Sequence, residues 1–327
     1  MNAPGDCLTA GPSETLTNLA VIGLFYPSLP LPAYPPPTDL NDLPYRYFKL
    51  PQTGATIYPS LDDLLANQNG RVIPPGNHLF VSYLNGPMDT DQGGVYELRS
   101  GGWVKAEGGR QAIPTFQGLL FSSQPRNAFG WVLEQTESLS APGADSAGTG
   151  KTYYRYDKVQ VYDIQSAGGV DWLLIGPGEW LNYRSVARVD PRTTRPEGVT
   201  TDRWIEVSLA EQTLAVYQND RLVFATLVSS GTGGWATHPG LFQIYKKLAV
   251  TPMSGFTEAD RSDYYYLEDV PWTMYFDEDR ALHGEYWHTK LGYPQSHGCV
   301  NLSVGDSHWL YNWASEGDYV YVFGALP

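Results

Sequence analysis

The chain has 327 residues and carries 35 Asp and Glu against 21 Lys and Arg, which gives a formal net charge of −14. Nucleic-acid binding depends on a surplus of basic side chains, so this charge argues against nucleic acid as a partner. Since a single hydrophobic core rarely grows beyond about 250 to 300 residues, the length predicts two or three domains.

The first 44 residues predict a flexible, proline-rich segment. A mildly apolar stretch at residues 19–31 is interrupted by Pro27 and Pro30, so we expect no transmembrane helix. The basic and apolar regions of a signal peptide are not visible at the start of the sequence. The density of proline at residues 27–44 favours an extended tether over a packed element.

Residues 45–190 alternate short runs of Val, Tyr, Phe and Trp with turns of Gly, Asn, Asp and Pro, a pattern typical of small β domains. A short helix is expected at residues 60–69, because Ser60 can cap it and leucines follow. A faint internal repeat divides the region into two modules, residues 45–120 and 121–190, which resemble bacterial SH3-like domains. The strands predicted here are residues 78–83, 94–98, 103–105, 130–133, 159–163 and 171–175.

Residues 191–198 lack apolar periodicity and predict a linker, so a further domain is expected at residues 199–327. Helical spacing occurs there only at residues 303–316, whereas the strands predicted are residues 203–209, 213–217, 222–227, 240–245 and 319–323. The predicted fold class is therefore mainly β, with small all-β modules followed by a β domain that carries one short helix.

The chain has two cysteines, Cys7 and Cys299, and the second lies in the run Ser-His-Gly-Cys-Val-Asn, sixteen residues after His283. A thiol attacks as the thiolate, so it needs a base, and His283 and His297 are the candidates. Gly298 would let the backbone turn and let a substrate carbonyl approach amide groups. This pattern predicts cysteine-based acyl transfer, while the alternative is a buried structural cysteine with structural histidines.

The motif resembles that of the L,D-transpeptidases of bacterial cell walls, a YkuD-like catalytic domain, over roughly residues 199–325. Further runs follow the family pattern, namely residues 204–209, 228–231, 239–244, 275–276 and 281–284. Two features depart from it: the spacing between His283 and Ser296 is short, and His238 stands in a turn where relatives often carry a small hydroxyl residue or proline. Neither departure touches the chemistry.

The resemblance implies a role for each matching residue. Cys299 would be the nucleophile and His283 its base, with the Gly284 carbonyl orienting the imidazole. The amides of Gly298 and Cys299 would form the oxyanion hole. The resemblance gives Ser296, His297 and Asn301 a supporting role in the cysteine loop, with a purely structural reading of His297 left open. Candidate substrate contacts are Tyr275, Trp287 and His288, and residues 264–272 would form a flap or simply pack.

The implied fold is a β-sandwich with a short helix after the cysteine loop, and the implied substrates are peptidoglycan stem peptides. With an amine acceptor the product is a crosslink, and with water the reaction is that of an L,D-carboxypeptidase. The resemblance implies no metal or organic cofactor, and it implies inhibition by carbapenem-type β-lactams. Such an enzyme acts outside the membrane at the cell wall, so we expect a mature or trimmed chain. A lipid anchor at Cys7 is the alternative, although no lipobox precedes it.

Three other classes of protein share some of these features. A papain-like wall peptidase also pairs cysteine and histidine, but its cysteine normally precedes its histidine in the chain. A zinc hydrolase could use His283, His288, His297 and His308, but the His-Glu-x-x-His spacing is missing. A non-catalytic wall-binding protein is the third class, and the intact pair of His283 and Cys299 argues against it.

Overall fold

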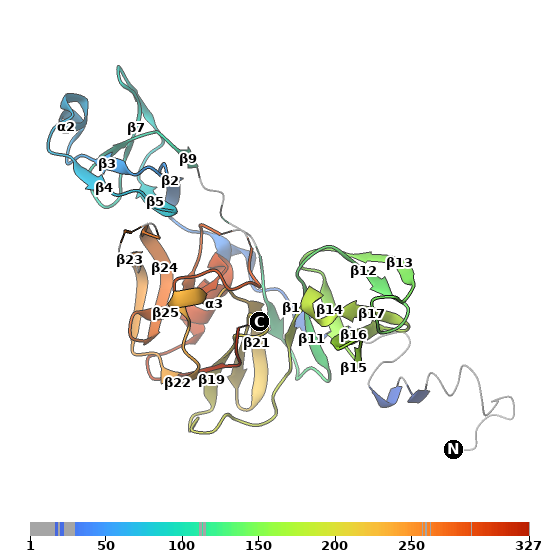
Figure 1. Ribbon diagram of the computed structural model, residues 1–327. Coiled ribbons are helices and arrows are strands. Elements are labelled where there is room, and N and C mark those ends of the chain that lie inside the picture. Colours follow the sequence, from blue (N-terminus) through green and yellow to red (C-terminus); the bar gives the residue numbers. More distant parts are fainter. Residues whose placement is uncertain are drawn as a thin grey trace, which may run out of the picture. The chain divides into compact units, whose positions relative to one another are not determined.

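The computed structural model describes residues 17, 18, 20–22, 30–110, 113, 116–256, 258, 260, 261, 263–288 and 290–326. Figure 1 shows their helices and strands, coloured along the sequence. The chain divides into two compact units. Unit 1 combines the described residues within 1–35 with residues 119–227 and 321–327, and unit 2 combines residues 36–118 with residues 228–320. Cys7 and the proposed lipid anchor lie outside the described residues.

Unit 1 contains an antiparallel run of four strands in the order β10 (Leu119–Phe121), β21 (Arg221–Leu227), β20 (Thr213–Gln218) and β19 (Arg203–Ser208). Trp204 of β19 and Tyr217 of β20 are directly paired, and their rings stack with centroids 4.8 Å apart. Both side chains are buried, so this aromatic pair stabilises the centre of the sheet.

Two smaller sheets complete unit 1. Their shared core includes Val132, Val159, Leu173, Leu181 and Val186, all buried. One sheet has the order β14 (Lys158–Val161), β11 (Ala128–Val132), β18 (Val186–Val189). The other has the order β13 (Gly148–Tyr153), β12 (Thr136–Leu139), β17 (Glu179–Asn182), β16 (Val170–Gly176), β15 (Asp163–Ala167), and a short 3-10 helix η2 (Tyr183–Ser185) follows β17.

The proline-rich segment differs from the tether that its composition predicts. Within its described part, β1 (Ala33–Tyr34) pairs antiparallel with β10, and a 3-10 helix η1 spans Thr38–Asn41. Proline lacks only the N–H donor, so the residues between prolines can still pair at the edge of a sheet. The extended-tether prediction is therefore wrong for residues 33–34 and 38–41.

Unit 2 is built on a sheet with the order β26 (Val300–Leu302), β25 (Arg280–Gly284), β24 (Tyr265–Asp277), β5 (His78–Tyr83), β2 (Arg46–Lys49), β9 (Gly109–Arg110). Strand β23 (Lys246–Gly255) also pairs with β24, outside this linear strand order. Side chains alternate along β5: Leu79 and Val81 enter one buried cluster, while Phe80 enters another with Tyr47 and Leu267.

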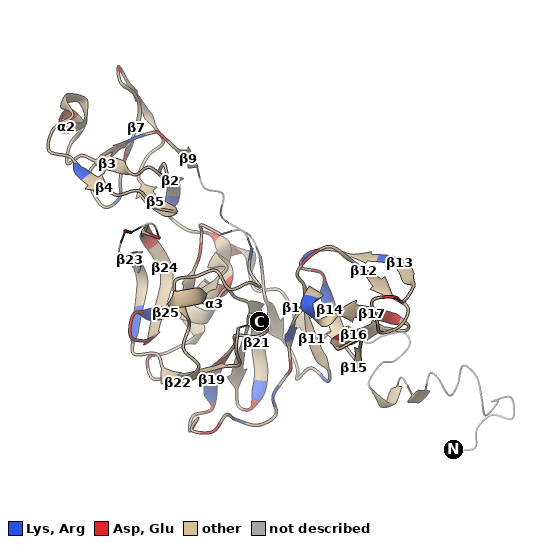
Figure 2. Cartoon of the chain, in the orientation of Figure 1, with Lys and Arg blue, Asp and Glu red and all other residues tan. Residues whose placement is uncertain are grey.

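The remaining elements of unit 2 are short. They are β3 (Ala55–Ile57), β4 (Arg71–Ile73), β6 (Met88–Thr90), β7 (Gly93–Glu97), β8 (Trp103–Lys105), β22 (Gly240–Gln243), a 3-10 helix η3 (Gly233–Trp235) and two α-helices. The last strand, β27 (Tyr319–Phe323), begins in unit 2 and ends in unit 1. Figure 2 shows Lys and Arg scattered over the strands and loops.

Both predicted helices form, and each begins at a serine cap. Helix α2 (Leu61–Ala66) follows Ser60, and α3 (Val304–Trp313) follows Ser303, whose side chain accepts a hydrogen bond from the Asp306 amide. Helix α3 follows the cysteine loop as predicted, but it is shorter than residues 303–316. The mainly β fold class with one short C-terminal helix is thus confirmed.

The compact units do not follow the predicted segments in order, because residues 36–118 pack with residues 228–320. The domain boundaries and the SH3-like character of the N-terminal modules stay predictions. Among the helices that the structure describes, none is long and apolar enough to cross a membrane.

Candidate active site

The motif residues meet on two neighbouring strands of unit 2. Strands β25 and β26 run parallel, with His283 opposite Asn301. Cys299 lies immediately before β26, at the end of the loop that leads into this strand. All three residues line one pocket, whose cavity volume is about 30 Å³. The described residues that complete its lining are His78, Met253, Tyr265, Leu267, Trp287, His288, Ser296 and His297.

His283 is buried and has a defined tautomer. Its Nδ1 lies 3.1 Å from the carbonyl oxygen of Gly284. A carbonyl oxygen can only accept, so Nδ1 carries the proton and Nε2 keeps a free lone pair. Burial lowers the pKa of His283 to about 4, although the hydrogen bond to Gly284 opposes this shift. At neutral pH the imidazole is therefore uncharged and can accept a proton.

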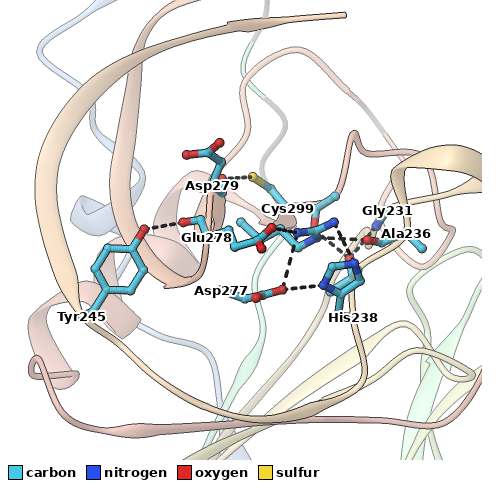
Figure 3. A network of polar contacts seen from close by, with 11 residues as sticks. Gly231, Ala236, His238, Tyr245, Asp277, Glu278, Asp279 and Cys299 are labelled. Atoms are coloured by element: carbon cyan, nitrogen blue, oxygen red, sulfur yellow. Dashed lines mark hydrogen bonds and ion pairs between the residues drawn. The ribbon is translucent and has the colours of Figure 1, made fainter. Parts of the chain in front are cut away.

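Cys299 is half-buried, and its Sγ donates a weak hydrogen bond to the carbonyl oxygen of Asp279 at 3.8 Å (Figure 3). Burial raises the pKa of the Cys299 thiol to about 11, and a backbone hydrogen bond from Ala281 and the positive charge of Arg280 offset this only in part. The pair is therefore a neutral thiol beside a neutral imidazole, so the thiolate must form during the reaction itself.

Hydrogen bonds within the cysteine loop fix its shape. The Ser296 hydroxyl donates to the Cys299 carbonyl and accepts the amide of Gly298 at 3.1 Å. Thr237 donates to the carbonyl of Gly298 at 2.9 Å. Gly298 has φ +108°, a backbone conformation that favours glycine. The Gly298 amide, predicted as an oxyanion donor, is thus bonded to Ser296 in this arrangement.

A polar network that sequence reasoning missed supports the cysteine loop (Figure 3). His238 Nδ1 donates to the Asp277 carboxylate at 2.9 Å, and Arg280 donates to His238 Nε2 at 2.9 Å. Arg280 also donates to the carbonyl of Ala236 at 3.0 Å. The guanidinium lowers the pKa of Cys299, so His238, noted in the sequence only as a variation in a turn, helps to hold the cation beside the thiol.

The predicted substrate contacts have different positions. Trp287 and His288 line the pocket, whereas its lining, as far as the chain is described, does not include Tyr275. Tyr275 lies on β24, opposite Ala281. Within the predicted flap, residues 264–272, Tyr265 and Leu267 line the pocket.

The ring of His297 packs between aromatic rings and also lines the pocket. Its centroid lies 4.9 Å from that of Trp235 and 4.8 Å from that of Tyr265. Burial lowers the pKa of His297. The structure thus gives His297 both a packing role and access to the site.

Two further residues, His78 in the pocket lining and Glu285 behind it, were not anticipated from the sequence. His78 reaches the pocket because β5 pairs in parallel with β24, which places it opposite Tyr265. Glu285 is 1% exposed, and its Oε2 accepts from Asn301 Nδ2 at 2.8 Å and from His288 Nδ1 at 3.0 Å. The position of Glu285 three residues before His288 could have indicated their contact. No neighbouring residue in the sequence pointed to a role for His78.

The site offers no obvious metal ligand set: within the described ranges, no group of three His, Cys, Asp or Glu residues could hold a metal ion. A mainly β unit that brings an oriented, uncharged imidazole and a thiol into one pocket defines a site suited to acyl transfer.

The sequence comparison then supplies the family. Residues 202–322 match the family model of the L,D-transpeptidase catalytic domain, YkuD. The family recognised from the Ser-His-Gly-Cys motif is thereby confirmed. A Bacillus subtilis (strain 168) protein, YciB, whose name assigns it provisionally to the L,D-transpeptidases, is 24% identical over 127 residues, which are 33% of this chain and 59% of that protein.

Solved structures with similarity to this chain carry the same family name. An L,D-transpeptidase from Stackebrandtia nassauensis has 31% sequence identity and a TM-score of 0.32, over 39% of this chain and 58% of that chain. The catalytic domain of an E. faecium L,D-transpeptidase acylated by ertapenem has 25% identity and a TM-score of 0.33, over 38% of this chain and all of that domain. Both TM-scores are low, so the family assignment rests on the matched sequence. The chain spans less than two thirds of the B. subtilis and S. nassauensis proteins.

Proposed function

We propose that this protein is a peptidoglycan L,D-transpeptidase that works through a thioester on Cys299, with His283 as the general base. The observation that carries this proposal is that Cys299, His283 and Asn301 line a single pocket, with His283 opposite Asn301 in the β25–β26 pair. The family match supports the proposed substrate class, namely the stem peptides of bacterial cell walls.

In the first half-reaction, His283 Nε2 takes the Sγ proton of Cys299 while the sulfur attacks the carbonyl carbon of an L,D-peptide bond. The Gly284 carbonyl keeps the accepting nitrogen free and oriented. The C–N bond of the donor stem then breaks, and the imidazolium returns the proton to the leaving amine. The product is a thioester between the shortened stem and Cys299.

Charge develops on the carbonyl oxygen during this attack. The amides of Gly298 and Cys299 are the proposed donors, and one such donor typically contributes about 3 to 4 kcal/mol. The Gly298 amide is bonded to the Ser296 hydroxyl, so it would have to exchange that partner for the substrate oxygen. We therefore propose that the Ser296 hydroxyl keeps the cysteine loop in its conformation before the substrate binds. His297 and Asn301 are proposed to shape the pocket around this loop.

In the second half-reaction, an acceptor amine attacks the thioester and forms the crosslink. Water in place of the amine would make the same site an L,D-carboxypeptidase. Carbapenem-type β-lactams present a strained carbonyl to the same thiol, and we expect them to acylate Cys299, as ertapenem does in the E. faecium relative. A substrate in the cell wall places the site outside the membrane.

The test is intact-protein mass spectrometry after incubation with a synthetic tetrapeptide stem, with and without an acceptor amine. The wild type should form a thioester adduct and, with the amine, a crosslinked product. Cys299→Ala should form neither, and His283→Gln should form the adduct at least about 100-fold more slowly, the usual contribution of a general base. His308→Gln is the matched control, because His308 stacks on Trp272, and the described pocket lining does not include it.

The outcomes separate the alternatives. Adduct followed only by release of tripeptide would favour the carboxypeptidase, whereas a wild type without any adduct would refute the thioester mechanism.

A further inference from the structure

The pocket holds a second imidazole of fixed tautomer. His288 Nδ1 lies 3.0 Å from Glu285 Oε2, and a carboxylate oxygen accepts, so the proton is on Nδ1 and Nε2 keeps its lone pair. Glu285 is 1% exposed and also receives the Asn301 amide. A buried carboxylate is thus used to orient a histidine of the pocket, as the Gly284 carbonyl orients His283.

The two imidazoles differ in what stabilises a positive charge on the ring. A neutral carbonyl holds His283, whereas a carboxylate at hydrogen-bond distance holds His288 and attracts an imidazolium much more strongly. A charged acceptor therefore orients the His288 ring, and a neutral one orients the His283 ring. The acylation mechanism does not use His288.

Two acceptor atoms beside His288 point to the chemistry of the missing partner. Among the described residues, neither Glu285 Oε1 nor Asn301 Oδ1 has a hydrogen-bond partner, although both atoms are buried. Leaving buried acceptors unpaired typically costs about 1 to 3 kcal/mol each, so the site favours a ligand that carries N–H donors. An amine is such a ligand, and Asn301 lines the same pocket as Cys299.

The other ionisable groups around His288 do not oppose a charge on it. Burial lowers the pKa of His78 to about 4 and that of His283 to about 4, and it also lowers the pKa of His297. These three rings are uncharged at neutral pH. The ring of His78 lies edge-on to that of His288, with the ring centroids 4.9 Å apart.

From this geometry we infer that His288, held by the buried carboxylate of Glu285, accepts the proton of the acceptor amine in the second half-reaction. The inference rests on the proposed thioester mechanism. The acceptor arrives as an ammonium, whose first proton goes to His288 Nε2 and from there to solvent. The amine nitrogen then forms the C–N bond, and its second proton goes to Cys299 Sγ as the C–S bond breaks, so one ammonium and one thioester give one amide, one thiol and one proton.

The experiment compares two acceptors on the stem adduct of the full chain. One is a stem amine, which is protonated in solution at neutral pH and needs a base. The other is hydroxylamine, which is uncharged at neutral pH and attacks thioesters without prior loss of a proton. Adduct formation and transfer are followed separately by intact-protein mass spectrometry for wild type, His288→Gln and Glu285→Gln, with thermal unfolding as the check on folding.

His288→Gln should form the adduct within about threefold of the wild-type rate, lose about 100-fold or more in transfer to the stem amine, and keep transfer to hydroxylamine. Glu285→Gln should also lose transfer to the stem amine selectively, by a smaller factor than His288→Gln. In the His288→Ala variant, added imidazole should restore transfer to the stem amine. Glu285 is a positioning residue, and the selectivity between the two acceptors is a readout that a purely structural role would not produce.

Three results would overturn the inference. Amine transfer by His288→Gln at the wild-type rate would show that the ring takes no proton, and equal loss with both acceptors would show that it only shapes the pocket. Loss of adduct formation would place His288 in the first half-reaction. A wild type that never forms the adduct would instead refute the proposed function itself.

Discussion

The pKa values of the reacting pair give a sharp expectation for the pH dependence of acylation. With a pKa of about 4, His283 stays uncharged far below the range of an ordinary imidazole. About 97% of it would be neutral at pH 5.5, against about 9% for an unperturbed histidine of pKa about 6.5. Cys299, with a pKa of about 11, stays a thiol throughout this range. Acylation should therefore slow by only a few per cent between pH 7.5 and pH 5.5.

The assay is the rate of adduct formation on Cys299 with a carbapenem, followed by intact-protein mass spectrometry from pH 5 to pH 8. The His308→Gln variant is the control for effects of pH on the reagent and on folding. An acid limb centred near pH 6.5, with about a tenfold loss at pH 5.5, would refute the reasoning, because it would mean that His283 titrates like a solvated imidazole.

Three further predictions concern stability and the cysteine loop. Burial raises the pKa of Glu206 from 4.5 to about 7, so its stabilising protonated form is fully present below about pH 4.5 and is lost as the pH rises through 7. The free energy of unfolding of Glu206→Gln, measured with urea, should accordingly rise relative to that of the wild type by up to about 3 kcal/mol between pH 4.5 and pH 8. A difference between the two proteins that does not change with pH would contradict this. Ser296→Ala removes the acceptor of the Gly298 amide and should slow acylation about tenfold, the equivalent of about 1.4 kcal/mol, as measured by adduct formation. Gly231→Ala would place a Cβ 1.9 Å from a backbone oxygen and 2.7 Å from the Gly298 Cα. This substitution should lower the free energy of unfolding by about 1 to 3 kcal/mol, measured by thermal or urea unfolding. Gly234→Ala is the control, because open space surrounds its Cβ position and no loss of stability is expected.

Features that depend on neighbouring residues were predictable from the sequence. Ser60 and Ser303 cap the two helices because a hydroxyl followed by apolar residues at helical spacing is a local signal. Strands such as β5, β8 and β19 agree with their predicted ranges to within about a residue, because alternating β-branched and aromatic residues between turns are local as well. The same holds for the motif around Cys299, whose spacing carried the family assignment.

Features that depend on which strands become partners were not predictable in this way. His78 enters the pocket only because β5 pairs in parallel with β24, and periodicity specifies the face of a strand but not its neighbour. Glu285 follows His283 by two residues and would be expected at a surface, yet Asn301 and His288 surround its carboxylate and keep it buried. The proline-rich segment shows the same limit, since its composition could not reveal that residues 33–34 find an edge strand.

The two pKa values also constrain how the thiol can react. Burial raises the pKa of the Cys299 thiol and lowers that of the His283 imidazole, so both shifts oppose transfer of the proton from sulfur to nitrogen. The neutral pair is therefore favoured before the reaction, and we expect proton transfer to His283 to accompany attack by sulfur. The electron pair then goes to a carbonyl oxygen, and stabilising that oxygen requires amide donors. Because the Gly298 amide is bonded to Ser296, exchange of that hydrogen bond for the substrate oxygen couples the position of the substrate to the reactivity of Cys299.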